Sequence, residues 1–195
     1  MTTKLFTMPL AKEDLQSLVA GDSIELTGTV LTARDAAHKR IQGLLAKGEK
    51  IPVDFTNQFI FFAGPCPARP GRVIGSIAPT TSMRMDSFTE MSFQLGILGM
   101  IGKGERAPFV AELCKKYRGI YFLSIGGASA LISQNVTQCE VLAFEDLGTE
   151  SIKRLTVEKL RLIVGIDSRG KVFQDAEIQK YRRPPAVRAA ITGSS

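Results

Sequence analysis

Three short polar segments between positions 34 and 104 hold the side chains best suited to gripping a small anion. The segments are Arg34-Asp35-Ala-Ala-His38, Pro79-Thr80-Thr81-Ser82-Met-Arg84-Met-Asp86 and Gly102-Lys103-Gly104. A guanidinium is always ionised and meets a carboxylate with two parallel hydrogen bonds, which makes Arg34 and Arg84 candidate clamps. Lys103 adds a compact third charge, and its flanking glycines let the backbone approach a ligand closely. These residue types predict a site for a small dicarboxylate.

Other polar residues of the same segments are predicted to support the clamps. Asp35 and Asp86 are expected to orient the arginines, and Thr81 stands where it can begin a helix. His38 is the only histidine of the chain. A lone histidine is more often a hydrogen-bonded structural residue than a catalyst, so we expect it to orient Asp35 or a substrate carboxylate. The structural alternative for Arg34, Asp35 and His38 is a capped first helical turn with a surface ion pair.

The hydrophobic pattern indicates alternating strands and helices. Alternation and short apolar runs predict strands at 24–32, 72–77, 98–101, 120–125, 140–144 and 162–167. Spacings of three and four predict helices at 36–48, 88–96, 108–117 and 150–155, with a short helical turn at 128–132. Residues 67–71 have the composition of a loop. Alternating strands and helices favour an α/β fold with a mainly parallel sheet.

Arg34 and Thr80 both fall where a predicted strand gives way to a predicted helix. Such junctions expose side chains and unpaired helix N–H groups at one edge of a sheet. Met83 and Met85, interleaved with the polar residues of the second segment, are expected to fill the core.

Composition limits the class of protein. The 195 residues, 44% hydrophobic and 23% charged, fit one soluble domain with a core at about 10–175 and a flexible basic tail at 182–195. The excess of six positive charges is scattered, tryptophan is absent and tyrosine is rare, so nucleic-acid binding is not expected. No apolar run approaches the roughly 18 residues of a spanning helix or the length of a signal peptide. We therefore expect a cytoplasmic protein without a membrane segment.

The cysteines and the glycine-lysine-glycine turn argue against other cofactors. The three cysteines are widely spaced and form no CxxC pair, which predicts no metal or cluster site in this chain. Lys103 is followed by glycine and position 97 is isoleucine, so the turn is not a Walker A loop. Gly102-x-Gly104-x-x-Ala107 matches the loose dinucleotide fingerprint, but the next predicted strand ends without the acidic residue that holds a ribose.

Taken together, the three segments resemble the β subunit, or the C-terminal region, of class I iron-sulfur fumarate hydratases and tartrate dehydratases. The resemblance covers roughly residues 10–175 and rests on the order of Arg-Asp-Ala-Ala-His, Pro-Thr-Thr-Ser and Gly-Lys-Gly. It implies the swivelling β/β/α fold, which has three layers. It also implies a 4Fe-4S cluster whose three cysteine ligands lie in a partner α subunit or in an N-terminal region, which fits the lack of a cluster motif here.

The resemblance assigns proton transfer to the first threonine of the Pro-Thr-Thr-Ser segment, which is Thr80. Removing a proton from a carbon next to a carboxylate builds negative charge that must be stabilised in the transition state. A free hydroxyl is a very weak base, so Thr80 could act only if nearby positive charge stabilised its alkoxide or a water relayed the proton. Arg84, four residues further on, could supply that charge.

The activity that the resemblance implies is a hydro-lyase β subunit that reversibly hydrates fumarate to malate. The enzymatic alternative is an L-tartrate dehydratase β subunit, which converts tartrate to oxaloacetate. A non-catalytic dicarboxylate-binding module is the alternative from another class. Ala36 and Ala37 favour the fumarase branch, but the residues that would read the extra hydroxyl of tartrate are not identified by the sequence. The implied assembly is a hetero-oligomer with the cluster-bearing chain, or a homodimer when this chain is isolated.

Overall fold

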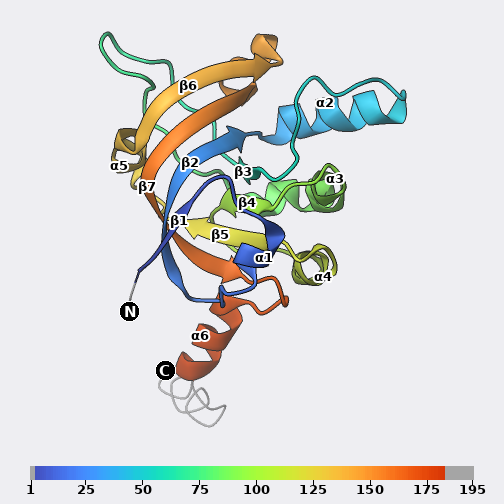
Figure 1. Cartoon of the computed structure of the whole chain (residues 1–195), viewed down its shortest axis with the longest axis vertical. Helices are drawn as coiled ribbons and strands as arrows, with labels where there is room; N and C mark the ends of the chain where they lie inside the picture. Colours follow the sequence, from blue (N-terminus) through green and yellow to red (C-terminus); the bar gives the residue numbers. More distant parts are fainter. Residues whose placement is uncertain (1–2, 183–195) are drawn as a thin grey trace, which may run out of the picture.

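The computed structural model describes residues 3–182, so the predicted flexible tail lies outside the described residues apart from Arg182. Within them, one seven-stranded sheet (Figure 1) contains β1 (Lys4–Thr7), β2 (Ser23–Thr32), β3 (Phe59–Phe61), β4 (Gly99–Gly102), β5 (Ile120–Ser124), β6 (Val136–Ala143) and β7 (Ile152–Ile166). The α-helices are α1 (Lys12–Leu15), α2 (Asp35–Ala46), α3 (Thr89–Gln94), α4 (Pro108–Tyr117), α5 (Ser129–Gln134) and α6 (Phe173–Tyr181). Two 3₁₀ helices are η1 (Ser82–Phe88) and η2 (Glu145–Glu150).

The sheet closes on itself because β7 is long enough to pair with three strands. The strand order is β1-β2-β3-β4-β5-β7-β6, and β2 also pairs with β7. β2 runs along one side of β7, while the other side of β7 pairs with β6 near its start and with β5 near its end. As a result β2, β3, β4, β5 and β7 form a closed barrel. β1 and β6 pair with the remaining parts of β2 and β7.

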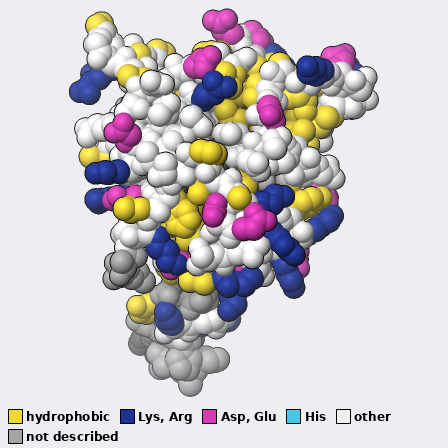
Figure 2. All heavy atoms as spheres, viewed as in Figure 1, with side chains coloured by type: hydrophobic (Ala, Val, Ile, Leu, Met, Phe, Trp, Pro, Cys, Tyr) yellow, Lys and Arg dark blue, Asp and Glu magenta, His cyan; other side chains and the backbone are white. Residues whose placement is uncertain are grey.

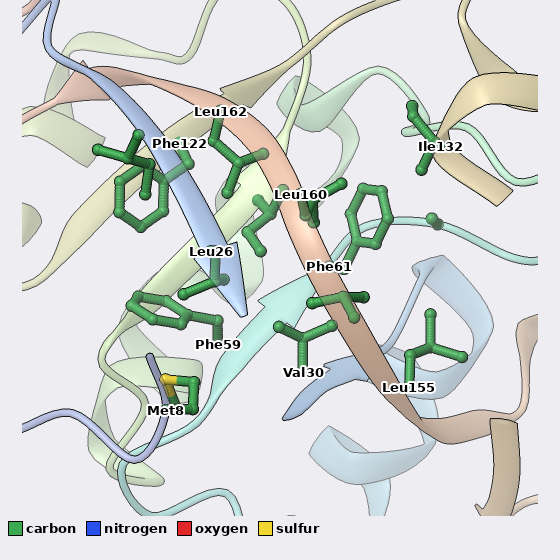
Figure 3. Packing of buried hydrophobic residues seen from close by; sticks show 14 of the residues in the cluster. Met8, Leu26, Val30, Phe59, Phe61, Phe122, Ile132, Leu155, Leu160 and Leu162 are labelled. Atoms are coloured by element: carbon green, nitrogen blue, oxygen red, sulfur yellow. The ribbon is translucent and has the colours of Figure 1, made fainter. Parts of the chain in front are cut away.

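Apolar side chains fill the inside of this barrel (Figure 3). Val30 of β2, Phe59 and Phe61 of β3, Phe122 of β5 and Leu162 of β7 lie close together there and are at most 1% exposed. Each of them contributes roughly 1.5 to 3 kcal/mol by leaving water. The interior is therefore a packed core rather than a ligand cavity.

The helices α2, α3 and α4 lie on one outer side of the barrel (Figure 1). Strand residues that point away from the interior, such as Ile60 and Met100, form a second core with Ile41 of α2 and Val110 of α4. The two walls of the barrel and this single helical layer give the β/β/α layering that the resemblance implies. The predicted α/β class is confirmed.

The carboxyl ends of β2, β3, β4 and β5 meet at one edge of the sheet, because these neighbouring strands run parallel. Arg34 and Lys103 follow β2 and β4 closely. Thr81 forms a parallel bridge with Lys103. All three polar segments therefore reach the same edge, which is the arrangement that the strand-to-helix junctions predict.

The sheet is less parallel than the sequence predicts. Four of its strand pairings are parallel, and the three that involve β7 are antiparallel. The long β7 includes most of the strand predicted at 162–167 and also runs through most of the helix predicted at 150–155. Leu155 and Val157 are spaced two apart and both face the interior, which is the strand period. The helix prediction at 150–155 was therefore wrong.

The predicted strand at 72–77 is an irregular loop. Its backbone folds back on Cys66 through two hydrogen bonds, from Cys66 N to Ser76 O and from Gly75 N to Cys66 O, each 3.0 Å long. Pro67 and Pro70 lack the N–H donors that a longer ladder would need, so the pairing stops there.

Charges are intermixed on the face shown in Figure 2, where acidic and basic side chains alternate with hydrophobic and neutral ones. No helix within residues 3–182 has the length and apolar character needed to span a membrane. Met85 is fully buried, as predicted, but Met83 is 54% exposed and does not fill the core. The 3₁₀ turn of η1 points these two neighbouring apolar positions in different directions.

Candidate functional site

Arg34 lies at the N-terminus of α2 with a carboxylate beside it. Glu150 accepts a hydrogen bond from the Ala36 N–H at 2.9 Å, and its other oxygen lies 3.4 Å from Arg34 Nη2. Position 64 must be glycine for this approach, because a Cβ there would lie 2.6 Å from Thr149 O and 3.4 Å from Arg34 Cδ. The positive end of the helix and the guanidinium thus both act on the Glu150 carboxylate.

Lys153 fixes the loop that carries Glu150. Its ammonium donates to Gly148 O at 2.8 Å and to Ser151 Oγ at 2.5 Å. Burial lowers the pKa of Lys153, whose residue is only 8% exposed. A buried ammonium with these acceptors holds the backbone between Gly148 and Ser151 in one conformation.

Arg84 connects the first polar segment to the second. Its Nε donates to Asp35 Oδ1 at 2.9 Å, and Nη2 lies 2.8 Å from Oδ2. Its Nη1 donates to Thr80 Oγ1 at 3.1 Å. The structure therefore brings Asp35, Thr80 and Arg84 together, and it places Asp35 where the sequence predicts, as the carboxylate that orients an arginine.

Lys103 is tied to the second segment through its backbone. Its N–H donates to Ser82 Oγ at 2.9 Å, and its carbonyl accepts from Ser82 N at 3.1 Å. The Lys103 ammonium makes no hydrogen bond or ion pair with residues 3–182, and its Cδ passes close to Gly126 at the end of β5. Thr81 is exposed and does not cap η1 with its side chain. The predicted capping role of Thr81 is therefore wrong, while the neighbouring Ser82 bonds the Lys103 backbone.

His38 is buried beneath the first segment. Its Nδ1 lies 2.8 Å from Arg34 O, and its ring stacks on Phe88 and meets the edge of Phe62. Burial lowers the pKa of His38 to about 4. At neutral pH the ring is uncharged and Nδ1 carries the hydrogen donated to Arg34 O. His38 thus holds the backbone of Arg34 and makes no hydrogen bond to Asp35, which corrects the predicted orienting contact.

Asp86 was predicted to orient Arg34 or Arg84. It contacts a third arginine instead, Arg106. Asp86 Oδ1 lies 2.5 Å from Arg106 Nε, and Oδ2 accepts from the Ala107 N–H at 2.7 Å. Arg106 also donates to Thr89 Oγ1 at 2.8 Å, and its side chain is 1% exposed. This buried pair joins η1 to the start of α4. It therefore stabilises the element that carries Arg84.

The cysteines do not form a metal-binding group. Cys66 lies in the loop after β3, Cys114 in α4 and Cys139 in β6. Burial raises the pKa of the Cys114 thiol to about 12, which opposes the thiolate that a metal needs. Within residues 3–182, no group of three or more His, Cys, Asp or Glu side chains is arranged to hold a metal ion.

Hollows on the surface lie away from the cationic edge. Three of them, of about 540, 520 and 400 Å³, are lined by other residues and include none of Arg34, Thr80, Arg84 or Lys103. The Arg84 side chain is 50% exposed. A ligand that meets Arg84 would therefore lie partly open to solvent on this chain.

The whole sequence, compared with known families, matches the one described as "Fumarase C-terminus" over residues 2–176. The chain belongs to this family. "Fumarate hydratase 1, mitochondrial" from Leishmania major is 36% identical over 169 residues, which are 85% of this chain and 31% of the relative. "L(+)-tartrate dehydratase subunit beta" from Escherichia coli is 36% identical over 191 residues, which are 94% of each chain. "Fumarate hydratase class I, aerobic" from Salmonella typhimurium is 32% identical over 163 residues, which are 83% of this chain and 28% of the relative.

The chain thus spans less than a third of the fumarate hydratases that it matches and almost all of the tartrate dehydratase subunit.

The sequence of this member of the fumarase C-terminus family did not identify several residues that shape the site. They are Tyr121, Arg106, Glu150, Lys153 and Ser82, the last as the partner of Lys103. Ser82 belongs to the second polar segment and could have been found there. The others lie outside the three segments, and nothing in their local sequence marks them.

Proposed function

We propose that this chain is the β subunit of a two-chain hydro-lyase that interconverts fumarate and malate. The observation that carries the proposal is the Arg84 guanidinium, which contacts both the Thr80 hydroxyl and the Asp35 carboxylate. Arg34 precedes Asp35 directly, and Lys103 pairs with the residue after Thr80. A hydroxyl and three cations therefore share one edge of the sheet. Relatives named fumarate hydratase and tartrate dehydratase support a hydro-lyase role.

Substrate binding would use donors that the fold leaves available. A guanidinium has five N–H donors, and the hydrogen bonds to Asp35 Oδ1 and Thr80 Oγ1 use two of the Arg84 set. Because the Arg84 side chain is 50% exposed, its other N–H groups can meet one carboxylate of the substrate. The Lys103 ammonium, which has no partner within residues 3–182, can meet the same or the second carboxylate. Asp35 keeps the plane of Arg84 fixed, so little side-chain entropy is lost on binding.

Thr80 is proposed as the base: its own hydroxyl proton first passes to water, and the alkoxide then takes the proton from the substrate carbon, which restores the hydroxyl. The hydrogen bond from Arg84 Nη1 to Thr80 Oγ1 would strengthen as the oxygen gains negative charge, because charge-assisted hydrogen bonds are about twice as strong as neutral ones. The same guanidinium also offsets charge that develops on the adjacent substrate carboxylate. The first effect favours formation of the alkoxide, and the second favours removal of the proton from the substrate carbon.

The 4Fe-4S cluster that the family resemblance implies does not fit the donors of this chain. The cysteines stand on three separate elements, and one of them is a buried thiol of raised pKa. We therefore assign the cluster to the partner chain.

L-Tartrate dehydration is the second candidate function. The observation that favours it is the end-to-end match with the tartrate dehydratase subunit, which is a separate chain of similar length. That match supports a two-chain organisation equally for both substrates. A dicarboxylate-binding module without catalysis remains the alternative from another class, and it requires no partner.

The test is anaerobic co-purification of this chain with the cluster-bearing chain, followed by assays with fumarate, malate and both tartrates. We expect turnover of fumarate and malate by the assembled enzyme and negligible turnover by the isolated chain. Turnover of tartrate alone would replace the first candidate with the second. Tight dicarboxylate binding by the isolated chain, with no turnover by the assembly, would favour the binding module.

A further inference from the structure

We infer that Ser82 is a positioning residue that acts on catalysis through Lys103. The Ser82 and Tyr121 hydroxyls form a hydrogen-bonded series, here called the hydroxyl chain. It begins and ends on the Gly102-Lys103-Gly104 turn. The inference rests on the proposed function, in which Lys103 contacts the substrate, and it identifies what holds Lys103 in place.

Three short contacts make up this hydroxyl chain. The Lys103 N–H donates to Ser82 Oγ at 2.9 Å, the Ser82 and Tyr121 hydroxyl oxygens are 3.0 Å apart, and Tyr121 Oη lies 3.2 Å from Gly104 O. A carbonyl only accepts, and each hydroxyl has one hydrogen. All three contacts are hydrogen bonds when Tyr121 donates to Gly104 O and Ser82 donates to Tyr121 Oη. The chain of donors then runs in one direction, from the Lys103 backbone to the Gly104 carbonyl.

The hydroxyl chain is buried, which makes its hydrogen bonds costly to break. Ser82 is 0% and Tyr121 1% exposed. Burial raises the pKa of Tyr121 to about 12, so its hydroxyl keeps its hydrogen at neutral pH. Loss of either hydroxyl would leave a buried donor or acceptor without its partner, and the turn would move to regain one.

Gly102 allows Ser82 to reach the turn. A Cβ at position 102 would lie 1.9 Å from Ser82 Oγ, far inside contact distance. The Ser82 N–H also donates to Lys103 O at 3.1 Å, so Ser82 binds both backbone polar groups of Lys103. Because the ammonium has no polar partner within residues 3–182, these backbone bonds set where it can reach.

Ser82 also links the two halves of the site. It is the first residue of η1, the 3₁₀ helix that carries Arg84, and it follows Thr80 by two positions. One side chain therefore fixes the Lys103 turn relative to the proposed base and clamp. A shift of about 1 Å in a catalytic group costs on the order of a hundredfold in rate, so this link is expected to matter for turnover.

The experiment is a double-mutant cycle in the assembled two-chain enzyme, with Ser82→Ala, Lys103→Met and both changes together. The readout is kcat/KM for malate and fumarate. We expect Ser82→Ala to lower kcat/KM by about ten- to a hundredfold in the wild-type background, and by less than about threefold once Lys103 is methionine. Ser87→Ala, at an exposed serine of the same 3₁₀ helix, is the matched control and should change kcat/KM by less than about twofold.

Equal losses from Ser82→Ala in both backgrounds would overturn the inference, because Ser82 would then act independently of Lys103. If Ser82→Ala fails to fold, Tyr121→Phe replaces it in the cycle, since phenylalanine keeps the ring and removes only the end of the hydroxyl chain. Tyr121→Phe is expected to cost about three- to tenfold, again only when Lys103 is present.

Amide hydrogen exchange in the purified chain separates this inference from the proposed function. The Lys103 amide should exchange at least about tenfold faster in Ser82→Ala than in the wild type, while amides of α4 keep their rates. Unchanged exchange at Lys103 would overturn the hydroxyl chain itself. An assembled wild type that turns over none of the dicarboxylates would overturn the proposed function and leave the exchange result standing.

Discussion

Acidification should destabilise the folded chain through one side chain, His38. It is the only histidine among the 195 residues and is 1% exposed. Burial lowers the pKa of His38 from 6.5 to about 4, and the charge of Arg106 acts in the same direction. The hydrogen bond to Arg34 O and the charge of Asp35 oppose this shift but do not cancel it. Nε2 has no hydrogen-bond partner within residues 3–182, so a proton there would be buried without an acceptor.

The sign follows from which state binds the proton. Below pH 6.5 the unfolded chain protonates His38 while the folded chain does not, so the stability present above pH 6.5 is lost as the pH falls toward about 4. Each unit of pKa difference corresponds to about 1.4 kcal/mol. The complete loss is therefore about 3 kcal/mol, of which about 2 kcal/mol has occurred at pH 5. Carboxylates of lowered pKa, such as Asp22 and Asp146, contribute mainly at lower pH.

The assay is urea unfolding of the wild type and of His38→Asn at about pH 7.5 and about pH 5. An asparagine amide can donate to Arg34 O from roughly the position of Nδ1 and does not titrate. The variant should be less stable at neutral pH because it loses the ring contacts with Phe62 and Phe88. It should, however, lose about 2 kcal/mol less than the wild type between the two pH values. The same pH dependence in both proteins would refute the reasoning.

Further predictions concern the proposed base, the clamp, the buried ion pair and the cluster. Thr80→Val should lower kcat of the assembled enzyme by about two to four orders of magnitude. Thr81→Val, at an exposed residue without a capping bond, should leave kcat nearly normal. Exchange of the malate C3 proton at the wild-type rate in Thr80→Val would place the base elsewhere. Arg84→Lys should lower kcat/KM by about ten- to a hundredfold, since lysine cannot serve Asp35, Thr80 and a carboxylate together, and a normal kcat/KM would remove Arg84 from the site. Asp86→Asn should lower the free energy of unfolding by about 3 to 5 kcal/mol in urea titrations, because the buried Arg106 charge loses its counterion; a change below about 1 kcal/mol would contradict this. The isolated chain, purified anaerobically, should be colourless and lack stoichiometric iron and sulfide, and a brown chain with bound iron would contradict the assignment of the cluster to the partner.

The elements that could be predicted from the sequence are those with strong local signals. The helix predicted at 108–117 has the same bounds in the structure, because Pro108 suits a first helical position and Arg118 ends the helix in the left-handed region. The helix predicted at 36–48 is α2, Asp35–Ala46. The placement of the polar segments at one edge followed from strand-to-helix junctions, which are also local features.

The parts that could not be predicted depend on contacts between distant residues. Glu150 reaches Ala36 across 114 positions, and the Lys153 N–H reaches Thr32 Oγ1 across 121. Both contacts exist because β7 pairs with β2 and closes the barrel. A short apolar run fits a helix or a buried strand equally well, so local spacing identified only the end of β7 and not its first half. The partner of Asp86 was missed for a related reason, since Arg106 lies outside the three polar segments.

The charge balance of the edge is a physical argument that this chain supplies only part of the site. Arg84 is paired with Asp35 and Arg34 lies beside Glu150, so two of the three cations already face carboxylates of this chain. Lys103 alone has no such partner within residues 3–182. These five side chains therefore carry one net positive charge, whereas a C4 dicarboxylate carries two negative charges. Removing a proton from it adds further negative charge in the transition state. This edge therefore holds less positive charge than the dianion needs, which fits the proposal that a partner chain completes the site.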